Sequence, residues 1–71
     1  MMINKRKFTE FIEGYKQADE FYNEYLRLYN DTVTEVRWTY LETAFMWMNR
    51  REEIKNNNLK LYYKAKELRV I

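Results

Sequence analysis

The sequence predicts an all-α fold: an antiparallel helical hairpin plus a short C-terminal helix, assembling into a homo-oligomer. The 71 residues contain one glycine and no proline, so the chain lacks the turn residues that β-hairpins need. Apolar residues recur at steps of three and four, the spacing of one helix face. The chain has no cysteine and no histidine, so disulfides and Cys/His zinc sites are excluded as a source of stability for so small a domain. Oligomerisation is the remaining source.

The first helix is predicted over residues 5–29. Its apolar side chains follow one seam in alternating steps of three and four, which is typical of a helix that packs along another helix. The seam comprises Phe8, Phe11, Tyr15, Ala18, Tyr22, Tyr25 and Tyr29. Asn30 and Asp31 favour a turn, so we expect the helix to end before them.

The second helix is predicted over residues 33–55. Thr32 followed by Glu35 matches a capping box, which would start this helix at Val33. The connection to the first helix is only a few residues long, so the two helices should fold back on each other as an antiparallel pair.

A third, shorter helix is predicted over residues 59–69. The run of three asparagines at positions 56–58 ends the second helix, and Leu61, Ala65 and Leu68 then recur on one face. The three helices are expected to form a single helical domain over residues 1–71.

The second helix is apolar on two faces. One face comprises Val33, Val36, Tyr40 and Trp47, and the other comprises Trp38, Leu41, Phe45 and Met48. Such a helix must be covered on two sides. The first helix can cover one side and the third helix part of the other, but we expect an additional subunit to cover Trp38 and Phe45. The alternative is a compact three-helix monomer with this helix in the middle.

The net charge is only +2, but the charges are unevenly spread along the chain. Residues 1–7 carry +3, residues 8–35 carry −5 and residues 36–71 carry +4. An acidic first half and a basic second half suit pairing within one chain or between chains. Charged side chains on solvated helix faces explain the same segment charges. A weaker hypothesis is DNA binding by the basic residues Arg50, Arg51, Lys55, Lys60, Lys64 and Lys66. The near-zero net charge argues against it, so no DNA partner is expected.

No segment is predicted to cross a membrane. The longest weakly charged run, from Trp38 to Asn49, is too short and contains Glu42. We therefore expect a cytosolic protein without a membrane partner.

The residue inventory argues against catalysis. Without histidine and cysteine there is no imidazole base and no thiolate, and one glycine is too few for a phosphate-cradling loop. Glu42, the only acid within the apolar stretch of the second helix, lacks a partner. The acidic residues do not have the spacing of a metal site. We expect no enzymatic activity, no cofactor and no metal.

The residue inventory suits ligand binding better than catalysis. The candidate binding residues are Tyr15 and Lys16 on the first helix and Arg37, Trp38, Thr39 and Tyr40 on the second. Flat rings beside cations and a hydroxyl suit a small aromatic anion such as a nucleotide, whose rings stack while its phosphates pair with Lys and Arg. Core packing is the alternative explanation for the aromatic residues.

The run Thr39 to Trp47 resembles a helix of the phage anti-CBASS cyclic-oligonucleotide sponges, in the hairpin domain that they share with the Thoeris anti-defence sponges. The matching positions are Thr39, Leu41, Glu42, Ala44, Met46 and Trp47. The segment from Tyr15 to Glu20 is similar to the family's Ile-Lys pair and the small and acidic residues after it. The resemblance spans roughly residues 9–50.

The resemblance implies a non-enzymatic viral protein that assembles into hexamers and sequesters the second messengers of bacterial antiphage defence. Its ligands would be cyclic dinucleotides, cyclic trinucleotides or cyclic ADP-ribose isomers, bound at subunit interfaces in the bacterial host's cytoplasm. Lys16, which matches the family's lysine, would contact phosphate, and Arg37 is the second candidate for phosphate contact. Tyr15, Trp38 and Tyr40 would lie near the bases, beside Thr39.

The sequence departs from the family pattern at two places. Tyr40 stands where the family has lysine, and Trp38 stands where it has the basic residue before Thr39. The cation lies one residue earlier, at Arg37, and a shift of one residue turns a side chain by about 100° around the helix. The N-terminal tyrosine of many members would fall at Met1 and is absent. An alternative function is a small helical phage protein that docks on a host protein through its second apolar face and inhibits it.

Overall fold

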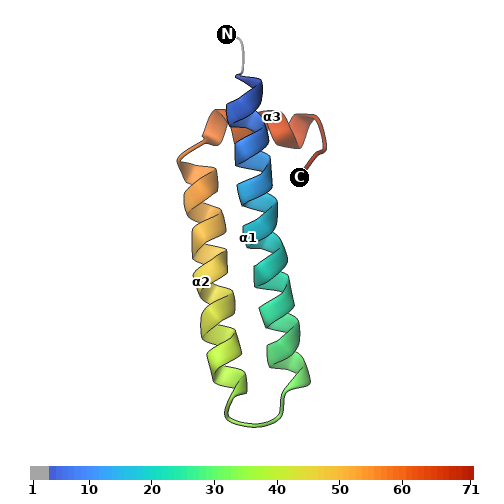
Figure 1. The fold of residues 1–71 in the computed structure, drawn as a ribbon, viewed down its shortest axis with the longest axis vertical. Helices are drawn as coiled ribbons and strands as arrows, with labels where there is room; N and C mark the ends of the chain where they lie inside the picture. Colours follow the sequence, from blue (N-terminus) through green and yellow to red (C-terminus); the bar gives the residue numbers. More distant parts are fainter. Residues whose placement is uncertain (1–3) are drawn as a thin grey trace.

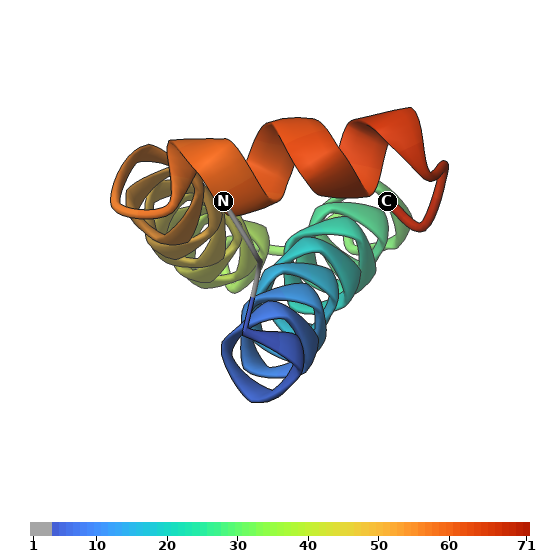
Figure 2. The ribbon, with the colours of Figure 1, turned by 90° about the horizontal axis from the view of Figure 1, so that it is seen from above.

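The computed structural model of the chain describes residues 4–71. Residues 1–3 of the predicted domain, which include the position of the family's N-terminal tyrosine, lie outside the described residues. The described part forms three helices and no strand: α1 (Lys5–Asp31), α2 (Arg37–Asn56) and α3 (Leu59–Glu67). α1 and α2 run antiparallel, and α3 crosses the end where α1 begins and α2 ends (Figure 1; Figure 2). The predicted all-α character is confirmed.

α1 is a 27-residue helix whose start and buried face are both readable in the sequence. The Asn4 side chain accepts hydrogen bonds from the backbone N–H groups of Arg6 and Lys7, at 2.9 and 3.2 Å, and so caps the first turn. The predicted seam is confirmed, because Phe11 and Ala18 are buried and its other members are partly buried. α1 continues two residues beyond the predicted end.

α2 begins four residues later than predicted. Thr32 takes an extended backbone with φ −105° and ψ 128°, and the N-cap is Val36, which makes no side-chain capping bond. The predicted capping box of Thr32 and Glu35 is therefore wrong. Four of the residues at positions 32–36 are β-branched, and such stiff side chains disfavour helix where the chain must span from one helix to the next.

α3 is nine residues long and ends two residues earlier than predicted. Ala65 is fully buried and Leu61 is partly buried, as predicted. Leu68 is the C-cap and is 53% exposed, so its predicted place on the packed face is wrong. The helix ends because Arg69 takes the left-handed backbone, with φ 57°, and the N–H of Val70 bonds back to the carbonyl of Ala65 at 3.1 Å.

The chain is elongated, measuring 51 × 19 × 16 Å, so the compact shape that the three-helix monomer alternative requires is not found. Its core is thin. Among the residues that the structure describes, the buried hydrophobic side chains are Phe11, Ala18, Ala44 and Ala65. α1 and α2 pack mainly through partly buried rings, with centroid distances of 4.7 Å for Phe21 and Trp47 and 6.3 Å for Tyr25 and Tyr40.

The two apolar faces predicted for the second helix have different surroundings. The face that carries Tyr40 and Trp47 packs on α1, as predicted. Val33, predicted on that face, lies in the link before α2 and is 91% exposed. Trp38 and Phe45, on the other face, are 55% and 46% exposed. α3 lies at the end of the hairpin where α2 ends (Figure 1), whereas Trp38 is the second residue of α2. A single chain leaves this face uncovered.

Candidate functional site

The candidate residues at the start of α2 form an aromatic cluster with the end of α1. The guanidinium carbon of Arg37 lies 4.4 Å from the ring centroid of Tyr29 and 5.5 Å from the ring of Trp38. The centroids of the two rings are 5.7 Å apart, and the rings are tilted by 54°. We call Tyr29, Arg37 and Trp38 the tip cluster, because it lies where the hairpin reverses.

Arg37 keeps its hydrogen-bonding capacity. Its Nε is buried and has no hydrogen-bond partner in the described part of the chain, where Arg37 forms no ion pair either. A guanidinium group presents five N–H donors in one plane, which suit phosphate and carboxylate oxygens. The buried Nε is out of reach of an anion from solvent, so an anion would bind through the terminal Nη groups of Arg37, and the 55% exposed Trp38 offers a ring next to them.

Thr39 and Tyr40 follow the tip cluster on α2. Thr39 is exposed, and its backbone carbonyl accepts a 3.0 Å hydrogen bond from the hydroxyl of Thr43. Tyr40 is partly buried, and its ring packs on Tyr25 in the hairpin interface. Of this pair, only Thr39 presents an open side chain to a ligand.

Tyr15 and Lys16 occupy the first half of α1. The ring of Tyr15 packs against Phe11 at 5.8 Å and against Tyr62 of α3 at 5.9 Å. Burial, followed by the effect of Tyr62, raises the pKa of the Tyr15 hydroxyl. Lys16 is exposed and forms no ion pair with any residue between 4 and 71. Lys16 is thus available to a ligand, whereas Tyr15 is part of the packing under α3.

The two groups of candidate residues lie apart within one chain. Lys16 precedes Tyr29 of the tip cluster by thirteen residues, which corresponds to about 20 Å along an α-helix. This separation along the helix favours a site in which Lys16 and Arg37 come from two different chains.

The sequence did not single out the polar contact that joins the two long helices. Nη1 of Arg51 lies 2.6 Å from Oδ1 of Asp19, and the guanidinium lies 5.2 Å from the ring of Tyr22. Burial acts to lower the pKa of Arg51, but the hydrogen bond and charge of Asp19 outweigh it, so the pKa is raised. The one signal in the sequence was the acidic first half facing a basic second half.

The basic residues of α2 and α3 have acidic or aromatic neighbours. Arg50 pairs with Glu53 at 3.0 Å, and Lys64 pairs with Glu67 at 3.7 Å. Nζ of Lys55 lies 4.8 Å from the ring centroid of Tyr62, and Nζ of Lys66 lies 5.7 Å from it. Acidic partners are thus interleaved with the cations on which the DNA hypothesis depends.

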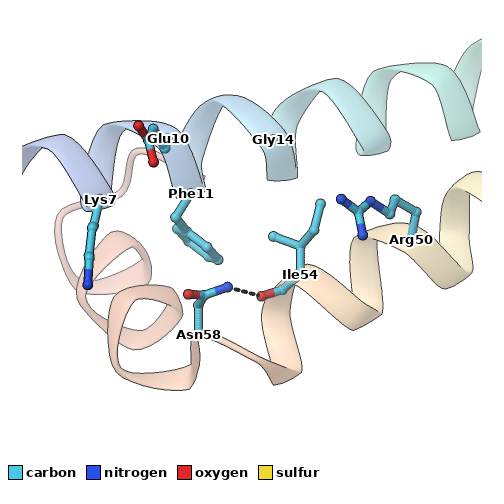
Figure 3. Close-up of a pocket in the computed structure, with 7 residues that line it drawn as sticks. All are labelled: Lys7, Glu10, Phe11, Gly14, Arg50, Ile54 and Asn58. Atoms are coloured by element: carbon cyan, nitrogen blue, oxygen red, sulfur yellow. Dashed lines mark hydrogen bonds between the residues drawn. The ribbon is translucent and has the colours of Figure 1, made fainter.

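A shallow depression of about 440 Å³ lies between the start of α1 and the end of α2 (Figure 3). Its lining residues are Lys7, Glu10, Phe11, Gly14, Arg50, Ile54 and Asn58. Nδ2 of Asn58 donates a 2.8 Å hydrogen bond to the carbonyl of Ile54 at its edge. None of the six candidate residues lines this depression, so it is separate from the tip cluster.

Two further searches of the described residues gave no candidates. Between residues 4 and 71, no group of three or more carboxylate side chains is placed to hold a metal ion. The described helices include none with the length and apolar character needed to cross a membrane.

Comparison with known proteins adds no relative. No protein-family model, no curated protein and no solved structure matches the chain. The resemblance of residues 39–47 to the sponge helix stays a prediction from the sequence, and the function is argued from the geometry of the tip cluster.

Proposed function

We propose that this chain is a phage-encoded, non-enzymatic sponge that binds and sequesters cyclic second messengers of bacterial antiphage defence. Its ligands are cyclic dinucleotides, cyclic trinucleotides or cyclic ADP-ribose isomers, bound at the interfaces of a homo-oligomer in the host cytoplasm. One observation carries the proposal. The guanidinium of Arg37 is stacked on Tyr29 beside the exposed ring of Trp38, and no described residue takes its hydrogen bonds.

Arg37 supplies phosphate recognition in this proposal. Stacking on Tyr29 orients the guanidinium plane before any ligand arrives, so less side-chain entropy is lost on binding. A phosphodiester accepts two parallel N–H bonds from such a group, and charge-assisted bonds of this kind are stronger than neutral ones.

Trp38 supplies a surface for a base. It is 55% exposed, and its ring lies next to the cation that binds the phosphate. Stacking of a base on an aromatic side chain contributes about 1–3 kcal/mol and tolerates different bases. A ring and a cation at this separation match the base and phosphate of one nucleotide.

Lys16 enters the proposed site from a neighbouring copy of the chain. It is exposed and lies about 20 Å along α1 from the tip cluster of its own chain. The proposal therefore needs a homo-oligomer, and the family resemblance makes a hexamer the expected form. The thin core and the uncovered face of α2 support assembly.

Isothermal titration calorimetry with cyclic dinucleotides, cyclic trinucleotides and cyclic ADP-ribose isomers tests the proposal. We expect tight binding of at least one of them. Arg37→Ala should weaken it about ten- to a hundredfold, since a charge-assisted contact contributes about 1.5–3 kcal/mol. Arg27→Ala is the matched control, because Arg27 is an exposed cation of α1 outside the tip cluster. Absence of binding to every messenger, or equal losses in both variants, would refute the proposal.

A second candidate is a small phage protein that docks on a host protein and inhibits it. The exposed link of the hairpin favours it, since Val33 and Val36 are 91% and 54% exposed next to Trp38. Sedimentation of the ligand-free chain separates the two candidates. The sponge should be a hexamer without any partner, whereas a docking inhibitor should be a monomer or a dimer.

A further inference from the structure

α2 carries an apolar stripe that its own chain leaves uncovered. The stripe consists of Trp38, Leu41, Phe45 and Met48, which share one side of α2 because steps of three and four return to the same helix face. Trp38 and Phe45 are about half exposed, and the other two are partly buried. α3 crosses the end of the hairpin where α1 begins and α2 ends (Figure 1; Figure 2), whereas the stripe lies in the first part of α2.

The amount of exposed surface indicates an interface of ordinary size. The chain has 5711 Å² of accessible surface, whereas a folded monomer of 9.0 kDa exposes roughly 4,900 Å². The surplus of about 800 Å² equals what one partner buries in a standard protein interface. The surplus follows from the elongated shape, since the radius of gyration is 14.6 Å against about 11 Å for a compact domain of this length.

We propose that the α2 stripe binds the same stripe of a second copy of this chain, with the two α2 helices antiparallel. The spacing of the stripe is three, four and three residues, which reads the same in both directions. A two-fold axis between Leu41 and Phe45 therefore superimposes the stripe on itself. Trp38 then faces Met48 of the partner subunit, and Leu41 faces Phe45 of the partner subunit.

The antiparallel arrangement joins unlike groups. Each contact pairs an aromatic ring with a flexible aliphatic side chain, and the sulfur of Met48 beside an indole ring adds a favourable sulfur–aromatic contact. The opposed helix dipoles attract. A parallel pair would instead bring the two Arg37 guanidinium groups to the same end, where they repel. α3 lies outside the paired segment in the antiparallel form.

This pairing rests on the proposed function only in that both require more than one copy of the chain. It requires no ligand, and because Met48 of the partner subunit would cover part of the exposed Trp38 ring, base stacking and pairing are compatible only where they use different parts of that ring. The first experiment therefore uses the nucleotide-free full chain.

Sedimentation equilibrium of Phe45→Glu and Met46→Glu tests the surface. Phe45 and Met46 are neighbours with similar exposure, 46% and 56%, but they point about 100° apart on the helix and only Phe45 belongs to the stripe. We expect the wild-type chain to associate, Phe45→Glu to weaken association at least a hundredfold, and Met46→Glu to change it by less than about threefold. A monomeric wild-type chain, or equal effects of the two variants, would overturn the pairing.

Disulfide formation tests the register of the pair, and this test remains informative even if a charged variant fails to fold. The chain has no cysteine, so single-cysteine variants give one reactive position per copy. Mixed Leu41→Cys and Phe45→Cys chains should oxidise mainly to the mixed dimer, because these positions face each other in the antiparallel pair. Preferential formation of Leu41→Cys homodimers would indicate a parallel pair and overturn the proposal.

The two proposals fail separately. A chain that dimerises with the predicted cross-links but binds no messenger would retain the pairing and refute the sponge. A chain that forms the oligomer without nucleotide and binds a messenger, but gives no cross-link between Leu41→Cys and Phe45→Cys chains, would refute the pairing alone.

Discussion

Arg51 of α2 donates a 2.6 Å hydrogen bond to Asp19 of α1, joining side chains 32 residues apart in the sequence. The Arg51 side chain is only 20% exposed, and its guanidinium also covers the ring of Tyr22 at 5.2 Å. The other contacts between the two long helices are mainly between rings, which tolerate sliding. The pair of Arg51 and Asp19 is directional and therefore fixes how far α1 is shifted along α2.

Replacing Arg51 should destabilise the hairpin. We expect Arg51→Ala to lower the free energy of unfolding by about 1–2 kcal/mol, because it removes a charge-assisted hydrogen bond. The loss is limited because Asp19 is 42% exposed, and solvent weakens the ion pair. Urea unfolding followed by circular dichroism measures the change. Arg50→Ala is the control, because its pair with Glu53 is exposed on both sides and contributes about 0.5 kcal/mol or less. Equal losses in the two variants would contradict the assigned role of Arg51.

The stability of the chain at alkaline pH should depend on Tyr15. Burial and the neighbouring Tyr62 raise the pKa of Tyr15 above 10.0, so the folded chain holds this proton more tightly than the unfolded chain. The stability from this group is complete below about pH 10 and is lost as the pH rises through the folded-state pKa. Tyr15→Phe keeps the ring but does not ionise, so it should reduce the alkaline fall in the free energy of unfolding.

Urea unfolding at a series of pH values from about 8 to about 11 measures this effect. Tyr63→Phe serves as the matched control, because Tyr63 is 64% exposed and lies beside Tyr62 on α3. The informative quantity is the difference between the two variants, because contributions common to both cancel in it. An alkaline fall in Tyr15→Phe as steep as in Tyr63→Phe would contradict the prediction.

The seam of α1 was predictable because it depends on local spacing alone. Phe11 and Ala18 recur at helical steps, and both are buried. The start of α2 was not predictable in the same way. Thr32 and Glu35 satisfy the local pattern of a capping box, but the chain must reverse and reach the neighbouring helix, and this requirement delays the start of α2 to Arg37.

The candidate site was predictable only in part, for a similar reason. Arg37 and Trp38 are adjacent in the sequence, so their proximity needed no tertiary information. Tyr29 was assigned to the seam, and nothing local showed that its ring would support Arg37. The distance between Lys16 and the tip cluster also depends on where the chain reverses, because the reversal sets which part of α1 lies beside Arg37.

Gly14 should be replaceable by alanine with a gain in stability. It lies inside α1 without a positive φ, and an added Cβ would meet only Ile54 Cδ1 at 3.7 Å, an ordinary contact. Glycine within a helix costs about 0.5–1 kcal/mol relative to alanine. Gly14→Ala should therefore raise the free energy of unfolding by about that amount in a urea titration. A loss of stability would show that the helices at Gly14 tolerate no added methyl group.

Lys16→Ala should weaken messenger binding about tenfold or more without lowering stability. Lys16 is exposed and forms no ion pair with the described residues, so its removal disturbs no packing. Under the proposed function it loses one charge-assisted phosphate contact. Calorimetry measures the affinity, and thermal unfolding without ligand provides the stability control. If Lys16→Ala binds the wild-type chain's messenger with unchanged affinity, Lys16 is not part of the site.

Mixing two defective variants decides whether Lys16 and Arg37 act from different chains. Lys16 lies about 20 Å along α1 from the tip cluster of its own chain, so the proposed site takes these two residues from two copies. Oligomers reassembled from equal amounts of Lys16→Ala and Arg37→Ala chains should then regain about a quarter of the wild-type sites, because only some neighbours pair an intact lysine with an intact arginine. Calorimetry counts these sites. A site built within one chain regains none, since every copy in the mixture lacks one of the two residues.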